Sequence, residues 1–334
     1  MQIVCKAPCR VDLAGGTLDI WPLYLNHPGA VTVNFAVDRY TSCSIETRDT
    51  SDILLRSRDL KSEEAYASLD ELRASAKPKL PLLARVLRFF GAPSGLTMET
   101  DSEAPAGAGI SGSSAMIIAV ASALNRLNAT RHPIEKIREI SQNIEAQIIQ
   151  VPTGCQDYYP AMYGGVSAVE LGPAGIRRVA LPVDLADFNQ RIVLAYTGLP
   201  RNSGINNWEV TKAYIDGDRK VRKNFEHIAA ISTAMRAAVE KADWTEAGRL
   251  LREEWSNRRK NAPGITTPLI DELIAVTRKA GALGAKVCGA GGGGCVFFLV
   301  DHGARDKVAS AIEKAGATVL PVKVAAKGVS IKTR

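Results

Sequence analysis

Residues 103–127, EAPAGAGISGSSAMIIAVASALNRL, join a glycine-rich turn to an apolar run at helical spacing. Residues 96–101 alternate as a β-strand does, so the pattern predicts a strand, a tight turn and a helix. Such a turn brings backbone N–H groups and a helix N-terminus to one point, which creates an anion site without a charged side chain. Glycine suits this turn because a Cβ would keep the backbone away from phosphate oxygens.

Three interpretations of this turn are open at this point: a serine-capped turn, a dinucleotide fingerprint and a phosphate loop. Residues 107–112 satisfy G-x-G-x-x-G, but a dinucleotide fold needs a second strand with an acidic residue about 20 positions later. Residues 133–150 are helix-like instead, and the chain contains no Walker A sequence. Ser113 and Ser114 add hydroxyls that can cap the helix or bind a phosphate-bound Mg²⁺.

Composition narrows the class of protein. The chain has 334 residues, of which 46% are hydrophobic and 23% charged, so it can build two domains or one large one around a sizeable core. The net charge of +7 is spread along the chain without a long block of like charge. A small anionic substrate explains the positive net charge as well as nucleic acid does. Because the basic residues are not clustered, we expect no nucleic-acid partner.

Cysteine and histidine usage argues against metal and redox motifs. The six cysteines form no C-x-x-C pair, so we expect buried thiols in a reducing cytoplasm. The four histidines lie too far apart in the sequence to suggest a zinc site.

Early charged residues argue against a signal peptide, and the apolar runs are too short to cross a bilayer. We therefore expect a cytoplasmic protein without a membrane partner.

The N-terminal region predicts a second part of a site. Residues 2–6 alternate as a strand, and residues 7–19, APCRVDLAGGTLD, follow as a glycine-containing site loop. Arg10 can neutralise charge that develops on a transferred phosphoryl group, and Asp19 can accept hydrogen bonds from sugar hydroxyls. The alternative interpretation is that Asp19 caps the next segment while Arg10 forms a surface ion pair.

Two carboxylates follow the central turn. Residues 133–150 form an amphipathic helix with Glu145 near its end, and Asp157 follows a Pro/Gly turn. Two carboxylates so placed can divide their work, one binding a divalent cation and the other contacting a substrate hydroxyl as a base or orienter. The alternative is a solvated helix charge and a turn aspartate.

The remaining chain contains a predicted hairpin over 165–181, a strand over 190–196 and long helices over 206–280. Residues 289–294, GAGGGG, then join two predicted strands at 285–288 and 295–300. Because glycine loses the most entropy on folding, a close approach of backbone must compensate for ordering this segment.

Three motifs together resemble the GHMP kinases, the family of galactokinase and of homoserine, mevalonate and phosphomevalonate kinases. They are Ala7-Pro8-x-Arg10, then Pro105-x-Gly107-x-Gly109-Ile110-x-x-Ser113-Ser114-Ala115, and finally residues 286–294, KVCGAGGGG. They occur in the family's order and span nearly the whole chain. The resemblance implies an α+β fold with a ribosomal-protein-S5-like N-terminal domain at 1–197 and a ferredoxin-like C-terminal domain at 198–334.

Within the family, the sugar kinases are most similar. Residues 14–19, AGGTLD, resemble the Ala-Gly-Gly-Gly-Thr-Asp loop of D-glycero-D-manno-heptose 7-phosphate kinases and parallel the Gly-Glu-His-Thr-Asp loop of galactokinases. The phosphate loop is one residue longer than the usual form, as in heptose kinases and fucokinases. Cys9 and the pair Ser111-Gly112 depart from the family pattern, which affects the expected substrate more than the reaction type.

The resemblance implies roles for the matched residues. Asp157 would act as base or orienter for the attacking hydroxyl, with Arg10 as its electrostatic partner. Glu145 and Ser114 would hold Mg²⁺. The residues implied to bind the ATP phosphates are Pro105, Gly107, Ala108, Gly109, Ser111, Gly112, Ser113 and Ser114. Those implied to contact the sugar are Gly16, Thr17, Asp19, Asp157 and Arg201.

The sequence therefore predicts an ATP- and Mg²⁺-dependent kinase acting on the anomeric hydroxyl of a heptose phosphate. Arg201, Arg258, Arg259 and Lys260 are candidates to bind the acceptor phosphate, although solvated helix charges are the preferred interpretation of the last three. Alternatives are a kinase of another small alcohol, such as fucose, galactose or mevalonate, and a non-catalytic sugar sensor. The sequence does not indicate an oligomeric state.

Overall fold

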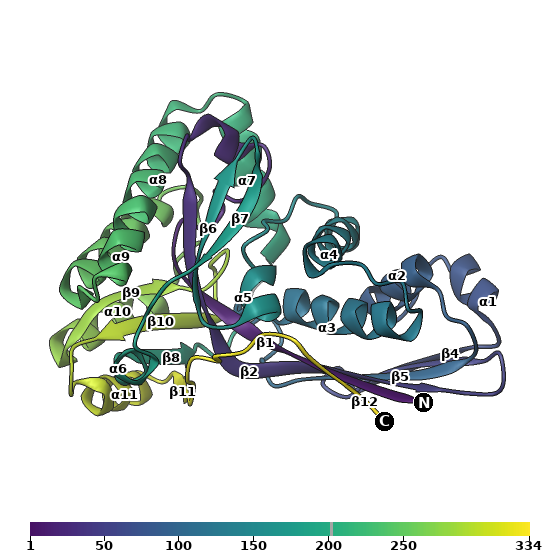
Figure 1. Ribbon diagram of the computed structural model, residues 1–334. Coiled ribbons are helices and arrows are strands. Elements are labelled where there is room, and N and C mark those ends of the chain that lie inside the picture. Colours follow the sequence, from purple (N-terminus) through teal and green to yellow (C-terminus); the bar gives the residue numbers. More distant parts are fainter. Residues whose placement is uncertain (201–202) are drawn as a thin grey trace.

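A computed structural model describes residues 1–200 and 203–334, which form two β-sheets with helices packed against them (Figure 1). The first sheet has eight strands, in the spatial order β12-β1-β2-β5-β3-β4, with β6 pairing to β2 and β7 to β6. Its strands are β1 (Gln2–Ala14), β2 (Val31–Thr47), β3 (Ile53–Ser57), β4 (Ser62–Tyr66), β5 (Leu96–Ser102), β6 (Val166–Gly172), β7 (Gly175–Ala180) and β12 (Ser330–Thr333).

A central helix, α3, covers this sheet and contacts β1 and β2 (Figure 1). Residues 115–121, AMIIAVA, carry no polar side chain and are all buried, as expected of a helix that is enclosed by other elements. The predicted strand, turn and helix around residues 96–127 are confirmed. The helices of this half are α1 (Leu69–Ala74), α2 (Pro81–Phe90), α3 (Gly112–Leu127), α4 (Ile134–Ile149) and α5 (Tyr158–Tyr163), with a short 3-10 turn, η1 (Leu23–Asn26).

The second sheet has four antiparallel strands in the order β11-β8-β10-β9. Helices separate β8 from β9 and β10 from β11 along the chain, so the connectivity is that of a ferredoxin-like fold, as predicted. Its strands are β8 (Ile192–Tyr196), β9 (Ala282–Val287), β10 (Cys295–Val300) and β11 (Thr318–Leu320). The helices here are α6 (Leu185–Gln190), α7 (Ser203–Ile215), α8 (Arg219–Glu240), α9 (Trp244–Arg258), α10 (Pro268–Ala280) and α11 (Arg305–Lys314).

The two sheets do not follow the predicted boundary between residues 197 and 198. The strand β8 precedes that boundary but pairs with β10 and β11 in the second sheet. The C-terminal strand β12 returns to the first sheet and pairs with β1, so both chain ends lie side by side (Figure 1). Strand pairing across long sequence separations, which local patterns do not report, decides this arrangement.

The first strand is longer than its sequence suggests. The predicted strand ends at residue 6, but β1 continues to Ala14, with register shifts against β2 between Pro8 and Cys9 and between Asp12 and Ala14. Irregular pairing of this kind accommodates a proline, which cannot donate to the ladder. Arg10 and Asp12 therefore lie on a rigid strand, and the prediction that they belong to a loop is wrong.

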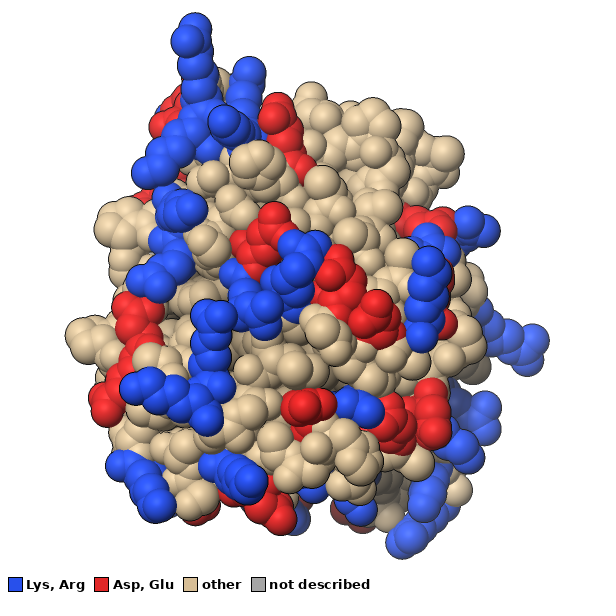
Figure 2. All heavy atoms as spheres, turned by 90° about the vertical axis from the view of Figure 1, so that its left-hand side faces the viewer, with Lys and Arg blue, Asp and Glu red and all other residues tan. Residues whose placement is uncertain are grey.

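Charges of both signs are mixed on the surface, and the cysteines lie in the interior. Figure 2 shows a face on which basic and acidic side chains are interspersed. Ion pairs within α9 join Arg249 to Glu246 and Glu253. All six cysteines are buried. None of the helices in the described part of the chain combines the length and apolar character needed to cross a membrane.

Helix α9 packs closely on β9 because two glycines meet. A Cβ added at Gly284 on β9 would lie 2.5 Å from the carbonyl oxygen of Gly248 on α9 and 3.0 Å from Cβ of Leu251. The helix and the strand can approach this closely only where side chains are missing. This contact fixes α9 relative to β9.

We predict that Gly284→Ala lowers the free energy of unfolding by about 1–3 kcal/mol, since the added methyl group must push α9 away from β9. Denaturant titration followed by circular dichroism measures the change. Gly172→Ala is the matched control, because a Cβ there would have its nearest neighbour, the carbonyl oxygen of Gly175, 3.9 Å away. Equal stability of the two variants would contradict the proposed close packing.

Candidate active site

The glycine-rich turn presents an open helix N-terminus. Gly107 and Gly109 have φ angles of 68° and 80°, and Ser111, the N-cap residue of α3, has φ 60°. Ser111 makes no side-chain cap, and its buried hydroxyl has no hydrogen-bond partner among the described residues. Because the first N–H groups of a helix lack partners within the helix, this end can bind an anion.

The third glycine-rich segment holds this turn in place. The backbone N–H of Cys295 donates to the carbonyl oxygen of Ala108 at 2.7 Å. Gly294 has a φ of 77°, and a Cβ there would lie 2.7 Å from the same carbonyl oxygen. A side chain would separate the two segments, so the cost of ordering this glycine is compensated by close backbone contact.

Arg10 connects the turn to α5. Its side chain is only 3% exposed. Nε and Nη2 donate to Oδ1 of Asp157, the N-cap residue of α5, at 2.8 and 2.7 Å. Nη1 donates to the carbonyl oxygen of Gly109 at 3.0 Å and to Oδ1 of Asp12 at 3.3 Å. The alternative that Arg10 forms only a surface ion pair is therefore wrong.

Glu145 on α4 lies beside the start of α3. Ser113 donates to Oε1 of Glu145 at 2.6 Å, and Ser114 and Tyr158 donate to Oε2 at 3.0 and 2.6 Å. Burial raises the pKa of Glu145, although the hydrogen bonds from Ser113 and Tyr158 oppose that rise. Within residues 1–200 and 203–334, no cation pairs with this carboxylate. Hydroxyl and carboxylate oxygens around a buried, uncompensated charge fit the hard-oxygen preference of Mg²⁺.

Asp19 is a second carboxylate without an ion pair among the described residues. It is 2% exposed, and its Oδ2 accepts the backbone N–H of Gln156 at 2.8 Å. Burial raises the pKa of Asp19 to about 6, and the nearby charge of Asp157 adds to the rise. A Cβ at Gly154 would overlap this carboxylate, so glycine is needed there.

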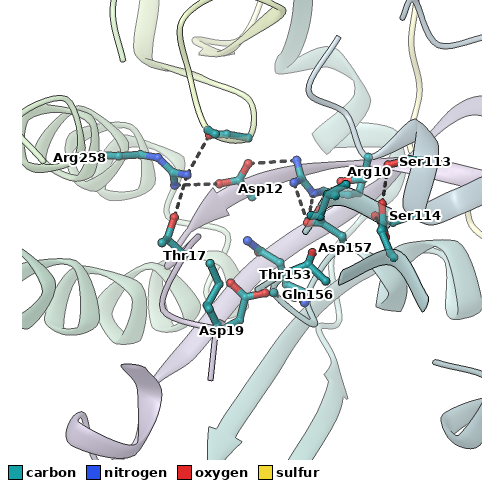
Figure 3. Close-up of a pocket in the computed structure, with 17 residues that line it drawn as sticks. Arg10, Asp12, Thr17, Asp19, Ser113, Ser114, Thr153, Gln156, Asp157 and Arg258 are labelled. Carbon is teal, nitrogen blue, oxygen red and sulfur yellow. Dashed lines mark hydrogen bonds and ion pairs between the residues drawn. The ribbon is translucent and has the colours of Figure 1, made fainter. Parts of the chain in front are cut away.

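These groups surround one cavity of about 90 Å³, and a neighbouring apolar groove of about 460 Å³ begins at the glycine-rich turn. Figure 3 shows Arg10 and Asp157 pointing toward each other, with Ser113 and Ser114 on one side and Asp12 and Arg258 on the other. The cavity and the groove share Ser111, Ser113 and Ile149. A ligand can therefore extend from one into the other along the N-terminus of α3.

Comparison with known proteins agrees with this geometry. A family model described as the GHMP kinases N terminal domain matches residues 80–165, which include the turn, Glu145 and Asp157. A second, described as GHMP kinases C terminal, matches residues 235–318, which include α9 and the third glycine-rich segment. The chain belongs to the GHMP kinase family.

Named relatives of this GHMP kinase are kinases of small alcohols. The chain is 26% identical over 318 residues to D-glycero-alpha-D-manno-heptose 7-phosphate kinase of Campylobacter jejuni, covering 92% of each chain. It is 27% identical over 359 residues to mevalonate kinase of Pyrococcus furiosus, covering 99% of each. The crystal structure of Lactococcus lactis galactokinase complexed with galactose shares the fold, with a TM-score of 0.81, 21% identity and coverage of 98% and 95%.

The structure brings most of the predicted site residues of this GHMP kinase together. Gly16 does not line the cavity, and a Cβ there would lie 2.6 Å from Nη1 of Arg258. Arg201 lies outside the described residues. Lining the apolar groove are Pro105, Gly107, Ala108, Gly109, Ser111, Gly112 and Ser113. Lining the smaller cavity are Arg10, Thr17, Asp19, Ser111, Ser113, Ser114, Glu145 and Asp157.

Sequence reasoning missed part of the site. For Arg258 the sequence favours a solvated helix charge over a role in binding the acceptor phosphate. Arg258 is instead 6% exposed and lines the cavity, where Nη2 donates to the carbonyl oxygen of Gly289 at 2.8 Å. Arg259 does lie on the surface, paired with Asp271. Asp12 was given no role, although it lines the cavity and is 1% exposed. Its two-residue spacing from Arg10 on one strand was the available signal.

We predict that Asp157→Asn lowers kcat by about 10²–10⁴-fold, because the amide keeps an oxygen facing Arg10 but cannot accept a proton. Nucleotide binding, measured by calorimetry, should stay close to wild type. Asp301→Asn is the control, since Asp301 is exposed and outside the cavity. Unchanged turnover in Asp157→Asn would remove this carboxylate from the chemistry.

Proposed function

We propose that this GHMP kinase transfers the γ-phosphate of ATP to the anomeric hydroxyl of D-glycero-D-manno-heptose 7-phosphate in a Mg²⁺-dependent reaction. One observation carries the proposal. An open helix N-terminus, the Glu145 carboxylate, which has no ion pair among the described residues, and the Arg10–Asp157 pair all border the same cavity. Phosphoryl transfer depends mainly on positioning and charge neutralisation, and these groups supply both.

The donor site follows from the apolar groove. Leu80, Leu83 and Met116 line it and can pack against a flat heteroaromatic base. The groove reaches the cavity at Ser111 and Ser113, so the phosphates of a nucleotide bound there would cross the N-terminus of α3. In this pose the N–H groups of the helix bind the phosphate oxygens.

Glu145 and Ser114 would hold Mg²⁺, with Ser113 as a further hydroxyl beside them. When bound, Mg²⁺ neutralises charge on the phosphates and orients them. A bound cation would also compensate the charge of Glu145. This explains how a carboxylate can be buried although it has no ion pair in the described part of the chain.

The acceptor site lies on the other side of Asp157. Its carboxylate orients the attacking hydroxyl and takes up the proton, while Arg10 keeps the carboxylate in place and stabilises charge that develops on the transferred group. Asp19 and Thr17 line the same cavity and can accept hydrogen bonds from the remaining hydroxyls of a sugar. Such a polar lining suits a polyhydroxylated acceptor.

The choice of heptose phosphate rests on the named relative that is 26% identical and on the AGGTLD loop. A kinase of another small alcohol is the second candidate, and it is favoured by 27% identity to mevalonate kinase over almost the whole chain. Because both candidates use the same donor and the same base, only the acceptor distinguishes them.

An acceptor panel tests the proposal. Purified protein with ATP and Mg²⁺ is given heptose 7-phosphate, the unphosphorylated heptose, fucose, galactose or mevalonate, and ADP release is measured. We expect heptose 7-phosphate to give the highest kcat/KM and phosphorus NMR to show a new anomeric phosphate. Preference for another alcohol would contradict the substrate assignment. Intact ATP binding without turnover of any acceptor would indicate a sugar sensor instead.

We predict that the acceptor KM rises roughly 10-fold as the pH falls from 8 to 5, because Asp19 takes up a proton and loses a charged hydrogen-bond acceptor. Initial rates between pH 5 and 8 measure the effect. A sugar phosphate itself titrates near this range, so Asp19→Asn is the required comparison. If Asp19 contributes as proposed, that variant starts with a raised KM and responds less to pH. The same pH response in both proteins would contradict the role of Asp19.

A further inference from the structure

Four buried charged side chains adjoin the cavity: Asp12 and Arg258 line it, whereas Lys286 and Glu254 do not. The reaction assigned above gives none of them a role. Nζ of Lys286 on β9 lies 2.5 Å from Oδ2 of Asp12 and 3.0 Å from Oε1 of Glu254 on α9. Lys286 and Glu254 are both 0% exposed. Nη1 of Arg258 lies 3.5 Å from Glu254 and 3.7 Å from Asp12. The group therefore joins the first strand to the second sheet.

Stability alone does not account for this group. Removing charges from water costs several kcal/mol for each ion, and apolar residues of similar volume often pack as well or better. Oε2 of Glu254 also has no hydrogen-bond partner within the described residues, which adds to the cost of burying it. A role in the neighbouring site is the better explanation for four buried acidic and basic side chains at this position.

The connection to the site runs through Asp12. Its Oδ2 faces Lys286, while its Oδ1 accepts Nη1 of Arg10 at 3.3 Å. Burial would raise the pKa of Asp12, but the charges of Lys286 and then Arg10 outweigh burial and hold that pKa well below its usual range. Asp12 is therefore ionised and lies between Lys286 and Arg10, with Arg258 as a third and more distant cation. Arg10 in turn contacts Asp157 through two nitrogens.

We propose that Lys286 is a positioning residue for phosphoryl transfer, acting through Asp12 on Arg10. By neutralising Asp12, Lys286 prevents that carboxylate from drawing the guanidinium of Arg10 away from Asp157. The second sheet thereby sets the geometry of the catalytic pair, although none of its residues needs to touch the reacting atoms. This inference rests on the kinase activity proposed above.

Two variants of Lys286 test the role. Lys286→Met removes the cation, and the double variant Lys286→Met/Glu254→Gln removes it while also removing one buried negative charge. The double variant therefore restores the charge balance of the group but still leaves Asp12 without Lys286. We expect kcat to fall roughly 100-fold in both proteins, with KM for ATP within about threefold of wild type, since a small misplacement of a catalytic group has effects of this size.

Lys279→Met is the matched control, because Lys279 on α10 is exposed and lies outside the cavity. Its kcat should equal that of wild type. Thermal unfolding of each variant establishes whether the protein is folded. Recovery of kcat in the double variant would show that Lys286 only balances buried charge and would overturn the proposal, as would unchanged kcat in Lys286→Met. Failure of the charge-balanced double variant to fold would assign Lys286 a structural role and would overturn it equally.

Wild-type turnover is measured first on the acceptor panel. Absence of turnover with every acceptor would contradict the proposed function. Normal wild-type turnover, together with full activity in Lys286→Met, would contradict only the positioning role of Lys286. The two failures are therefore distinguishable in one set of assays.

Discussion

The guanidinium of Arg10 is the group on which the site depends. It donates to Asp12 on its own strand, to the carbonyl oxygen of Gly109 in the glycine-rich turn, and to Asp157 at the start of α5. A cation that is almost fully buried must keep such partners, because leaving it uncompensated is costly. The strand, the turn and the helix are thus held in a fixed arrangement before any ligand arrives, which is the preorganisation that charge-stabilising catalysis requires.

Carboxylates around the cavity fall into two classes. Asp12 and Asp157 are paired with cations of the chain, whereas Glu145 and Asp19 receive only hydrogen bonds within the described residues. Burial raises the pKa of both members of the second class. In the proposed reaction, a divalent cation would compensate the charge of Glu145 and sugar hydroxyls that of Asp19. The ion pairs of Asp12 and Asp157 hold the site together, and the two carboxylates without an ion pair in the described part of the chain are the ones proposed to face ligands.

Predictions from the sequence succeeded where the signal was local and strong. The turn and helix of residues 103–127 and the amphipathic helix bearing Glu145 were predictable, because glycine conformation and apolar periodicity act over a few residues. The short elements β4, α1 and α5 were not predicted, since each is too brief to show a period. The continuation of β1 through Pro8 was missed because the pairing with β2, and not propensity, maintains the strand.

The sequence by itself determined the family and the order of the glycine-rich motifs, because both depend on residue types within short segments. Only the tertiary structure decided that Arg258 is buried at the cavity and that Lys286 meets Asp12, a residue 274 positions earlier in the chain. It also placed β8 and β12 in their sheets. The physical reason is that burial and charge pairing arise when distant strands pack together, and a side chain's environment is then set by neighbours that the local sequence does not contain.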